Sequence, residues 1–262
     1  MIKERDISDV ATHERPLEGM KVLELGQILA GAFTTTILGY FGAEVIKVEP
    51  PGEGDPIRNW RTVKDGTSLW WWSLARNKQS ITINLKSHEG QQLVRRLCEK
   101  CDVLIENFRP GQMEKWGLGP TEIKQINSSL IYTRISVYGQ TGPYSSDPGF
   151  ASVCEGFGGF RYINGEPGEI PVRPNLSLGD TLAGIHAALG VCMAYIRCLR
   201  QGEGKGQVVD VSIFESVFNM LEAVVPEYSG AGEVREPSGS TIKGIVPSNT
   251  YRCKDGKLVI IG

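Results

Sequence analysis

Histidine and cysteine are scarce in this chain, which holds three histidines and six cysteines among 262 residues. A structural zinc site usually takes four ligands from these two residue types, and the single CxxC, Cys98 with Cys101, has no second pair at matching spacing. A zinc site is therefore disfavoured, and six cysteines indicate ordinary usage in a reducing compartment, not a disulfide framework. We interpret Cys98 and Cys101 as two thiols at the end of a helix, and no sequence feature assigns them a role.

An excess of charge of one sign is also missing. The chain has 28 Lys and Arg against 30 Asp and Glu, a net charge of -2, so the basic excess expected of a nucleic-acid-binding protein is absent. No unbroken apolar run approaches the roughly 18 residues of a membrane span. Residues 1–16 are polar and of mixed charge, and they lack the apolar core of a signal peptide. We expect a cytoplasmic protein with neither a nucleic-acid nor a membrane partner.

Glycine, in contrast, is abundant, with 32 residues against a usual share of about 7%. Hydrophobic residues make up 40% of the chain, which is enough for a packed core. The glycines predict many tight turns and places where the backbone approaches a ligand closely.

Short apolar runs alternate with helical patterns along the first half of the chain. A strand at 21–26, a helix at 30–42 and a strand at 44–49 have the size of a βαβ unit. The same alternation continues through a strand at 80–85, a helix at 87–100, a strand at 102–107, a short helix at 120–127 and a strand at 130–137. This order predicts an α/β fold that is Rossmann-like, with a mainly parallel sheet and helices on both faces.

The pattern lapses into turns between 138 and 180, and a connection of this length in a compact domain is usually functional or disordered. Its interleaved aromatics and glycines favour a functional loop. A helix follows from Thr181 to about Arg200, then a strand at 208–213 and a helix that Pro226 is expected to end. The spacing predicts that the buried face of the 181–200 helix consists of Leu182, Ile185, Leu189, Met193 and Ile196.

These elements divide the chain into three parts. Residues 1–16 form a tail, 17–226 form the N-terminal part of a large domain, and 227–262 form a linker and the first hairpin of a smaller second domain. The hairpin turns at Asp255 and Gly256, a preferred tight-turn pair. Because a two-stranded hairpin is only marginally stable alone, we expect the second domain to be truncated at residue 262.

Several positions are candidates for ligand binding. The loop after the first strand lacks GxGxxG, so a dinucleotide is disfavoured. The run Trp70, Trp71 and Trp72 is more typical of a core or an interface than of a ligand platform. Positive charge at Arg76 and Lys78 suits phosphates, although a solvated loop is the simpler interpretation. The ENFRPG run at 106–111 follows a strand, at the edge where open parallel sheets bind ligands.

Asp180 is the most interesting acid, because it stands at the expected start of the 181–200 helix. It has two interpretations, an N-cap that accepts a backbone N–H or a carboxylate that the helix N-terminus keeps ionised for nucleophilic attack. The position alone favours the N-cap. His186 is interpreted as a residue of the helix core face.

Six runs together resemble the class III CoA-transferases, the family of formyl-CoA transferase, carnitine CoA-transferase and the 2-methylacyl-CoA racemases. The order and spacing of these runs make the likeness specific, and it covers roughly residues 16–262. The runs are PLEGMKVLELGQILAGAF, LGYFGAEVIKVEPPGEGD, RNKQSITINLKSHEGQQLVRRL, DVLIENFRPGQMEKWGLG, ISVYGQTGPY and LGDTLAGIHAALGVCMAYIRCLRQGEGKGQVVDVSIFES.

The resemblance implies a large Rossmann-like domain, a smaller domain and an interlocked homodimer. It places the family's nucleophilic aspartate on Asp180, because Gly179, Gly184 and His186 complete the matching pattern. Contacts to coenzyme A are implied for the 26–30 loop and for residues further along the chain. The implied contact residues are Gln27, Ile28, Leu29, Ala30, Asn77, Lys78, Asn107, Phe108, Lys115 and Tyr138.

Four departures from the family pattern affect the interpretation. Pro50 replaces a frequent arginine, and Lys115 and Leu29 stand where formyl-CoA transferase has arginine and glutamine. Phe150 and Ala151 occupy the positions of the racemase His–Asp pair. Since proton removal and return at an α-carbon needs an acid and a base, CoA transfer is favoured over racemisation.

The resemblance implies the following reaction. Asp180 attacks an acyl-CoA thioester, an aspartyl-CoA thioester forms, and CoA passes to a carboxylic acid acceptor. Acyl-CoA is a substrate, and no permanent cofactor or metal is needed. The glycines at 156, 158 and 159 are expected to supply N–H groups to the oxyanion. A dicarboxylate such as succinate is the favoured substrate class. An acyl-CoA racemase and a catalytically inactive CoA-binding fragment stay open as alternatives, and the sequence does not identify the donor or the acceptor.

Overall fold

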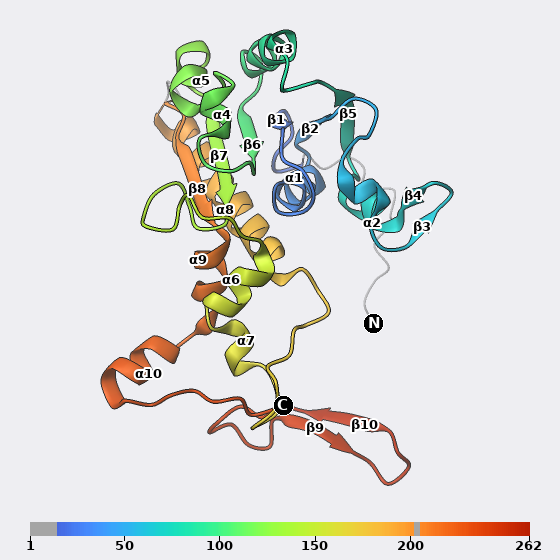
Figure 1. The fold of residues 1–262 in the computed structure, drawn as a ribbon, viewed down its shortest axis with the longest axis vertical. Coiled ribbons are helices and arrows are strands. Elements are labelled where there is room, and N and C mark those ends of the chain that lie inside the picture. Colours follow the sequence, from blue (N-terminus) through green and yellow to red (C-terminus); the bar gives the residue numbers. More distant parts are fainter. Residues whose placement is uncertain (1–14, 202–204) are drawn as a thin grey trace, which may run out of the picture.

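A six-stranded parallel sheet forms the centre of the molecule (Figure 1). The computed structural model describes residues 15–201 and 205–262, so most of the predicted 1–16 tail lies outside the described residues. The strand order is β5–β2–β1–β6–β7–β8, and every neighbouring pair is parallel. The strands are β1 (Lys21–Glu24), β2 (Glu44–Glu49), β5 (Lys78–Thr82), β6 (Val103–Glu106), β7 (Ile131–Ser136) and β8 (Val208–Ser212).

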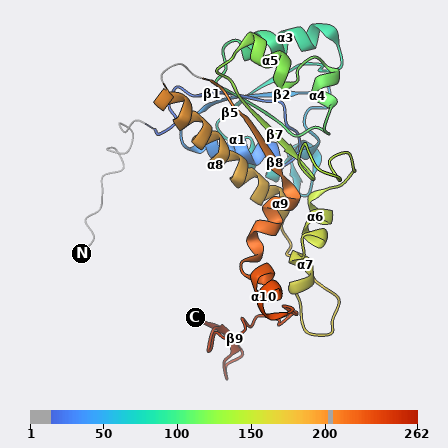
Figure 2. The same cartoon turned by 90° about the vertical axis from the view of Figure 1, so that its left-hand side faces the viewer.

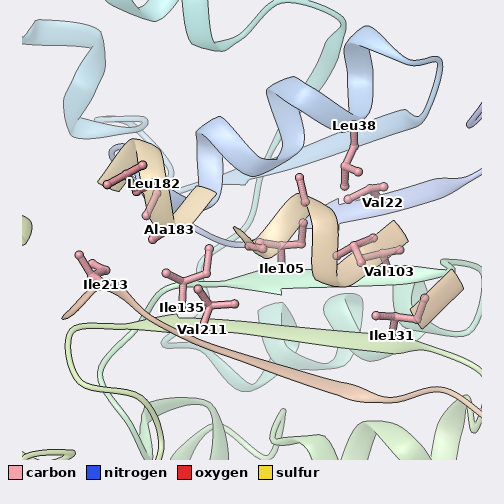
Figure 3. Close-up of a cluster of buried hydrophobic side chains, with 14 of the residues drawn as sticks. Val22, Leu38, Val103, Ile105, Ile131, Ile135, Leu182, Ala183, Val211 and Ile213 are labelled. Carbon is pink, nitrogen blue, oxygen red and sulfur yellow. The ribbon is translucent and has the colours of Figure 1, made fainter. Parts of the chain in front are cut away.

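Helices cover both faces of this sheet, which confirms the predicted fold class (Figure 2). One face carries α1 (Ala30–Tyr40) and α8 (Leu178–Gln201), and the other carries α3 (His88–Cys98), α4 (Gln112–Lys115) and α5 (Pro120–Ile126). Every residue of β6 and β7 is buried, as expected of strands that are covered on both sides. Figure 3 shows part of the core between the sheet and α8, including Ile105, Ile135 and Leu182.

The strand order reverses between β1 and β6. The chain runs outward from β1 through β2 to β5, then returns to the middle of the sheet and runs outward through β6 and β7 to β8. At such a switch point the loops that leave the carboxyl ends of the two central strands diverge and leave a crevice between them. The loop after β1 and the loop after β6 therefore meet where ligands are expected.

The helix α8 packs on α1 through small residues, and this reverses the predicted buried face. Leu182 is buried as expected, but Ile185, Leu189, Met193 and Ile196 are exposed. The buried side is instead rich in alanine and glycine. A Cβ at Gly184 would come within 3.0 Å of the Phe33 ring and 3.2 Å of the Ala30 carbonyl oxygen. Small side chains thus allow a close helix contact, which a pattern of large apolar residues does not reveal.

Among the described residues, α8 is also the one helix long and apolar enough to cross a membrane by length and composition. Its sequence contains no long unbroken apolar run, because His186 and Arg197 interrupt it. A core helix meets the same criteria, and the packing of α8 against α1 and the sheet is that of a core helix.

Three differences from the predicted elements stand out. Strand β5 begins at Lys78 and not at 80, and α8 begins at Leu178, so Asp180 lies inside the first turn and is not the N-cap. The expected helix up to Pro226 is three pieces, α9 (Ile213–Phe218), η3 (Asn219–Leu221) and α10 (Val224–Ala231). Pro226 lies in the first turn of α10, where the missing N–H costs no hydrogen bond.

The remaining elements are short. The 138–180 connection contains α6 (Ala151–Phe157) and α7 (Phe160–Ile163), and the segment between β2 and β5 contains η2 (Pro56–Asn59), β3 (Val63–Lys64), β4 (Thr67–Ser68) and α2 (Leu69–Leu74). The predicted C-terminal hairpin is present as β9 (Asn249–Arg252) and β10 (Leu258–Ile261). Both views place α10 and this hairpin at the end of the molecule opposite α3 (Figures 1 and 2).

Candidate functional site

The two loops at the switch point are joined by one side chain. The Oδ1 atom of Asn107, just after β6, accepts a hydrogen bond of 2.8 Å from the Gln27 N–H, and its Nδ2 donates one of 2.9 Å to the Gln27 carbonyl oxygen. Gly26 makes this approach possible, because a Cβ at that position would lie 3.0 Å from the same Oδ1. Asn107 therefore holds the loop after β1 in place with its amide.

The next residue of that loop has an unusual backbone. Ile28 has a φ of 67°, in the left-handed region where a β-branched side chain is strained. Its N–H donates to both carboxylate oxygens of Asp55, each at 3.1 Å. Asp55 is fully buried and also accepts from the Ile57 N–H. The hydrogen bonds to the buried Asp55 carboxylate thus hold Ile28 in this strained backbone conformation.

A buried cluster of two lysines and two carboxylates lies beneath the loop. The Lys47 ammonium is 2.6 Å from Glu24, 2.8 Å from Asp55 and 2.9 Å from the Gly26 carbonyl oxygen. Burial would raise the pKa of Glu24, but the ammonium groups of Lys47 and Lys78 lower it to about 2. The cluster therefore contains two positive and two negative charges, which neutralise each other in the protein interior.

Lys78 belongs to this cluster, which contradicts its implied role as a surface contact for phosphates. Its ammonium lies 3.0 Å from Glu24 and donates a 2.7 Å hydrogen bond to the Ala32 carbonyl oxygen. Burial lowers the pKa of Lys78, while Glu24 opposes this effect. The side chain is 2% exposed, so its charge stabilises the fold beneath the site and does not face a ligand.

A cavity of about 360 Å³ lies above this loop and brings several predicted residues together. Asp180 lines it, together with Ile28, Leu29, Asn107 and Phe108. Trp60, Trp70 and Phe150 add aromatic walls, and Arg109 and Arg173 add positive charge. A larger hollow of about 670 Å³ lies along β8 and α9, and none of the predicted site residues lines it. The smaller cavity is therefore the candidate active site.

Asp180 is held beside a second, fully buried carboxylate. Glu155, on α6, accepts a 3.3 Å hydrogen bond from the Gly179 N–H and is bonded by Arg161 at 3.1 Å. Burial raises the pKa of Asp180, the negative charge of Glu155 raises it further, and Arg173 opposes both, with a result of about 6. The expected effect of the helix N-terminus is thus outweighed, yet the carboxylate is still mostly ionised at neutral pH.

The other predicted contact residues lie outside this cavity. Gln27 and Ala30 flank the lining residues Ile28 and Leu29 in the chain but do not line the cavity, and Tyr138 packs among the rings of Tyr144 and Phe157. Asn77 donates to the Gly39 carbonyl oxygen at 3.3 Å, and Lys115 is exposed in the last turn of α4. Contacts of these residues with coenzyme A stay predictions, since coenzyme A is long enough to extend well beyond the cavity.

The glycines near 156–159 do not have the role expected of them. The Gly158 N–H donates to the Cys154 carbonyl oxygen at 2.8 Å, and the Gly159 N–H donates to Gly156 at 3.1 Å. These donors end α6 and are not free for an oxyanion. Gly158 is needed for packing, because a Cβ there would lie 2.8 Å from the Cys154 carbonyl oxygen, and Gly159 has a φ of +87°.

Four features of the site were not found in the sequence. Glu155 and Arg173 lie in the turn-rich segment before Asp180, where no periodic pattern marks them, and the buried roles of Glu24 and Lys47 appear only once the strands are paired.

The three consecutive tryptophans lie in three different environments. Trp71 is buried as expected of a core residue, Trp70 lines the cavity and Trp72 is exposed.

Comparison with known proteins agrees with this arrangement. The model of CoA-transferase family III matches residues 17–262. The chain belongs to this family. A solved CAIB/BAIF family protein from Brucella suis has the same fold, with a TM-score of 0.87 and 35% identity over 95% of this chain and 66% of that chain. Curated relatives of this chain are named as CoA-transferases.

Two of these relatives carry substrate names. The succinyl-CoA–D-citramalate CoA-transferase of Chloroflexus aurantiacus is 50% identical over 95% of this chain and 61% of the relative. The human succinyl-CoA:glutarate CoA-transferase is 37% identical over 94% of this chain and 56% of the relative. The chain therefore spans about three fifths of the length of the curated relatives it matches.

Proposed function

We propose that this family III chain carries the catalytic aspartate of a CoA-transferase that moves CoA from an acyl-CoA to a carboxylic acid, with dicarboxylates as its substrates. The observation that carries the proposal is Asp180, which lines the switch-point cavity. A pKa of about 6 leaves its carboxylate ionised at neutral pH and more basic than an ordinary aspartate, which favours nucleophilic attack.

The first half-reaction begins when an Oδ atom of Asp180 attacks the thioester carbonyl carbon of the donor. The C–S bond breaks, CoA thiolate leaves, and an aspartyl–acyl anhydride forms. The thiolate then attacks the aspartyl carbonyl carbon and releases the donor acid as a carboxylate. Asp180 now holds CoA as a thioester, and no proton has been gained or lost.

The second half-reaction reverses these steps with the acceptor. Its carboxylate attacks the aspartyl thioester, thiolate leaves, and the thiolate attacks the acceptor's carbonyl carbon in the new anhydride. Acyl-CoA of the acceptor leaves, and the Asp180 carboxylate is restored. The free energy of the thioester bond is conserved in the covalent intermediates, so the sequence of steps needs no other energy source.

Two observations support dicarboxylates as the substrate class. The relatives named above act, by their names, between succinyl-CoA and citramalate or glutarate. The cavity itself combines apolar walls, such as Ile28 and Leu29, with the arginines Arg109 and Arg173. Apolar walls suit the methylene chain of such an acid, and the arginines suit its charges.

The experiment is to trap the covalent intermediate in the whole protein. Hydroxylamine added after succinyl-CoA should convert Asp180 to a hydroxamate, which peptide mass spectrometry locates, and Asp180→Asn should lose both the adduct and CoA transfer. Asp210→Asn is the matched control, because Asp210 lines the other hollow and bonds the Gln140 N–H. An adduct on another residue, or full activity in Asp180→Asn, would refute the proposal.

The racemase alternative is separated by isotope exchange. Phe150 lines the cavity and Ala151 is buried beside it, and neither side chain can carry a proton between substrate and solvent. We expect no washout of an α-deuterium from a 2-methylacyl-CoA, whereas a racemase would exchange it with water.

A further inference from the structure

The positive charge in the cavity is the feature that the proposed reaction leaves unused. Arg173, in the connection between α7 and α8, lines the cavity together with Asp180. Its side chain is 47% exposed, in contrast to Glu155 behind it, which is fully buried. A guanidinium that lines a cavity and makes only a long ion pair with a buried carboxylate is available to a second anion.

Contacts within the protein engage Arg173 only weakly. Its Nε lies 3.9 Å from Glu155, beyond hydrogen-bond distance, and its Nη2 donates to the Leu176 carbonyl oxygen at 3.5 Å. Arg161 makes the shorter contacts to the same Glu155 oxygen, at 3.1 and 3.3 Å. Arg161 therefore neutralises Glu155, and within the described part of the chain most of the N–H donors of Arg173 have no partner.

Arg173 is also close enough for its charge to reach the reacting group, since it lowers the pKa of Asp180 against the combined effect of burial and Glu155. A dicarboxylate donor that approaches Asp180 meets two negative charges, Asp180 itself and Glu155, and the acceptor later meets the charge of Glu155 while Asp180 holds CoA as a thioester. A cation on the same cavity wall offsets this repulsion and attracts an anionic acid into the site.

We propose that Arg173 binds the carboxylate that does not react, and that it thereby selects short dicarboxylic acids over monocarboxylic acids of the same length. This inference rests on the proposed function. The guanidinium presents parallel N–H donors that match the two oxygens of a carboxylate.

The non-reacting end is the better partner for chemical reasons. The reacting group is negatively charged as a carboxylate and neutral as an anhydride and as a thioester, whereas the distal carboxylate keeps its charge throughout. A cation bound to the reacting carboxylate would also stabilise it as a ground state and reduce its nucleophilicity. A fixed arginine at the distal end holds donor and acceptor in one register while the bonds change at Asp180.

The test compares two acceptors in the whole protein, glutarate and pentanoate, which have the same chain length and differ in the second carboxylate. Arg173→Gln should lower kcat/KM for glutarate by about 10- to 100-fold and change that for pentanoate by less than about 3-fold. Arg173→Lys, which keeps the charge and loses the fork, should fall between Arg173→Gln and the unaltered protein. If pentanoate transfer is too slow, its inhibition constant against glutarate replaces kcat/KM.

Arg161→Gln is the matched control, because Arg161 bonds Glu155 but does not line the cavity. Arg161→Gln should change kcat/KM for glutarate and for pentanoate by the same factor. Equal losses for both acids in Arg173→Gln, or the same loss of discrimination in Arg161→Gln, would overturn the assignment of Arg173. Neither result affects the proposed function, which the hydroxylamine adduct on Asp180 of the unaltered protein tests separately.

Discussion

The carboxylate of Asp180 is kept in an environment that raises its free energy. Burial and the neighbouring Glu155 raise its pKa from 3.8 to about 6, and Arg173 offsets only part of this. A raised pKa means that the folded state holds the proton more tightly than the unfolded state does. At neutral pH, where both states are ionised, the charge of Asp180 therefore destabilises the fold, and the proposed function gives that charge a role in the chemistry.

Asp180→Asn should consequently be inactive and more stable. Each pKa unit corresponds to about 1.36 kcal/mol, and partial exposure reduces the full effect, so we expect a gain in unfolding free energy of about 1–2 kcal/mol at pH 7–8. The gain should shrink as pH falls from 6 to 4, because Asp180 is then protonated in the folded state. Urea unfolding of both proteins between pH 4 and 8 measures it, and a loss of stability in Asp180→Asn at pH 8 would contradict the prediction.

Asp180 itself could be predicted from the sequence, but its surroundings could not. The family pattern around Gly179 and His186 selects this one acid, and a covalent role follows from the resemblance. Glu155 and Arg173 are brought to it by the turns between α6 and α8, and no spacing rule links them to Asp180. The helix N-terminus was expected to favour the carboxylate, but burial and Glu155 raise the pKa of Asp180, and only the folded structure reveals them.

The loop after β1 depends on the cluster of Glu24, Lys47, Asp55 and Lys78 beneath it. Lys78→Met leaves one buried carboxylate charge uncompensated and should lower the unfolding free energy by about 3–5 kcal/mol. Lys115→Met, at an exposed position of α4, should change stability by less than about 0.5 kcal/mol and weaken CoA binding about 10- to 100-fold.

Two measurements on both variants distinguish the roles of Lys78 and Lys115. Denaturant unfolding gives the free energy of unfolding, and calorimetry gives the affinity for CoA. Adding Glu24→Gln to Lys78→Met should restore part of the lost stability, since it removes the uncompensated charge. The prediction fails if Lys78→Met has normal stability and binds CoA weakly, because Lys78 would then face the ligand.

The element order was predictable because strands and helices have distinct hydrophobic periods, and β1, β2, β6 and β7 read as short buried runs. The orientation of α8 was not predictable in the same way. Its large apolar side chains, such as Leu189 and Met193, point to solvent in this chain, while Ala187 and Val191 are buried. Close packing of two helices favours small residues, and a scale that scores size and hydrophobicity together assigns them to the wrong face.

At the scale of the molecule, the exposed apolar side chains include a row along α8 and a group on the C-terminal hairpin. Leu189, Met193 and Leu199 on α8, and Leu258 and Ile260 on β10, are each more than half exposed. Apolar patches of this kind promote association. Residues 1–262 produced alone should therefore self-associate, as light scattering would show.

Replacing Leu189 and Met193 together with glutamate should reduce this association, because the charges make the α8 surface compatible with water. Glu18→Lys, on the exposed turn before β1, is the control. A monodisperse monomer for the unaltered 1–262 chain would contradict the prediction.

The strand order determines which parts of the site are present at each stage of synthesis. The first half of the sheet, β1, β2 and β5, comes from residues 21–82, and the second, β6, β7 and β8, comes from residues 103–212. During synthesis the amino-terminal half emerges first, yet its Gln27 loop has no Asn107 to hold it and no Asp180 beside it. Asp180 belongs to the second half of the chain and lines the cavity together with residues of the first half, such as Ile28. Under the proposed function, a nascent chain that ends before Asp180 cannot consume thioesters.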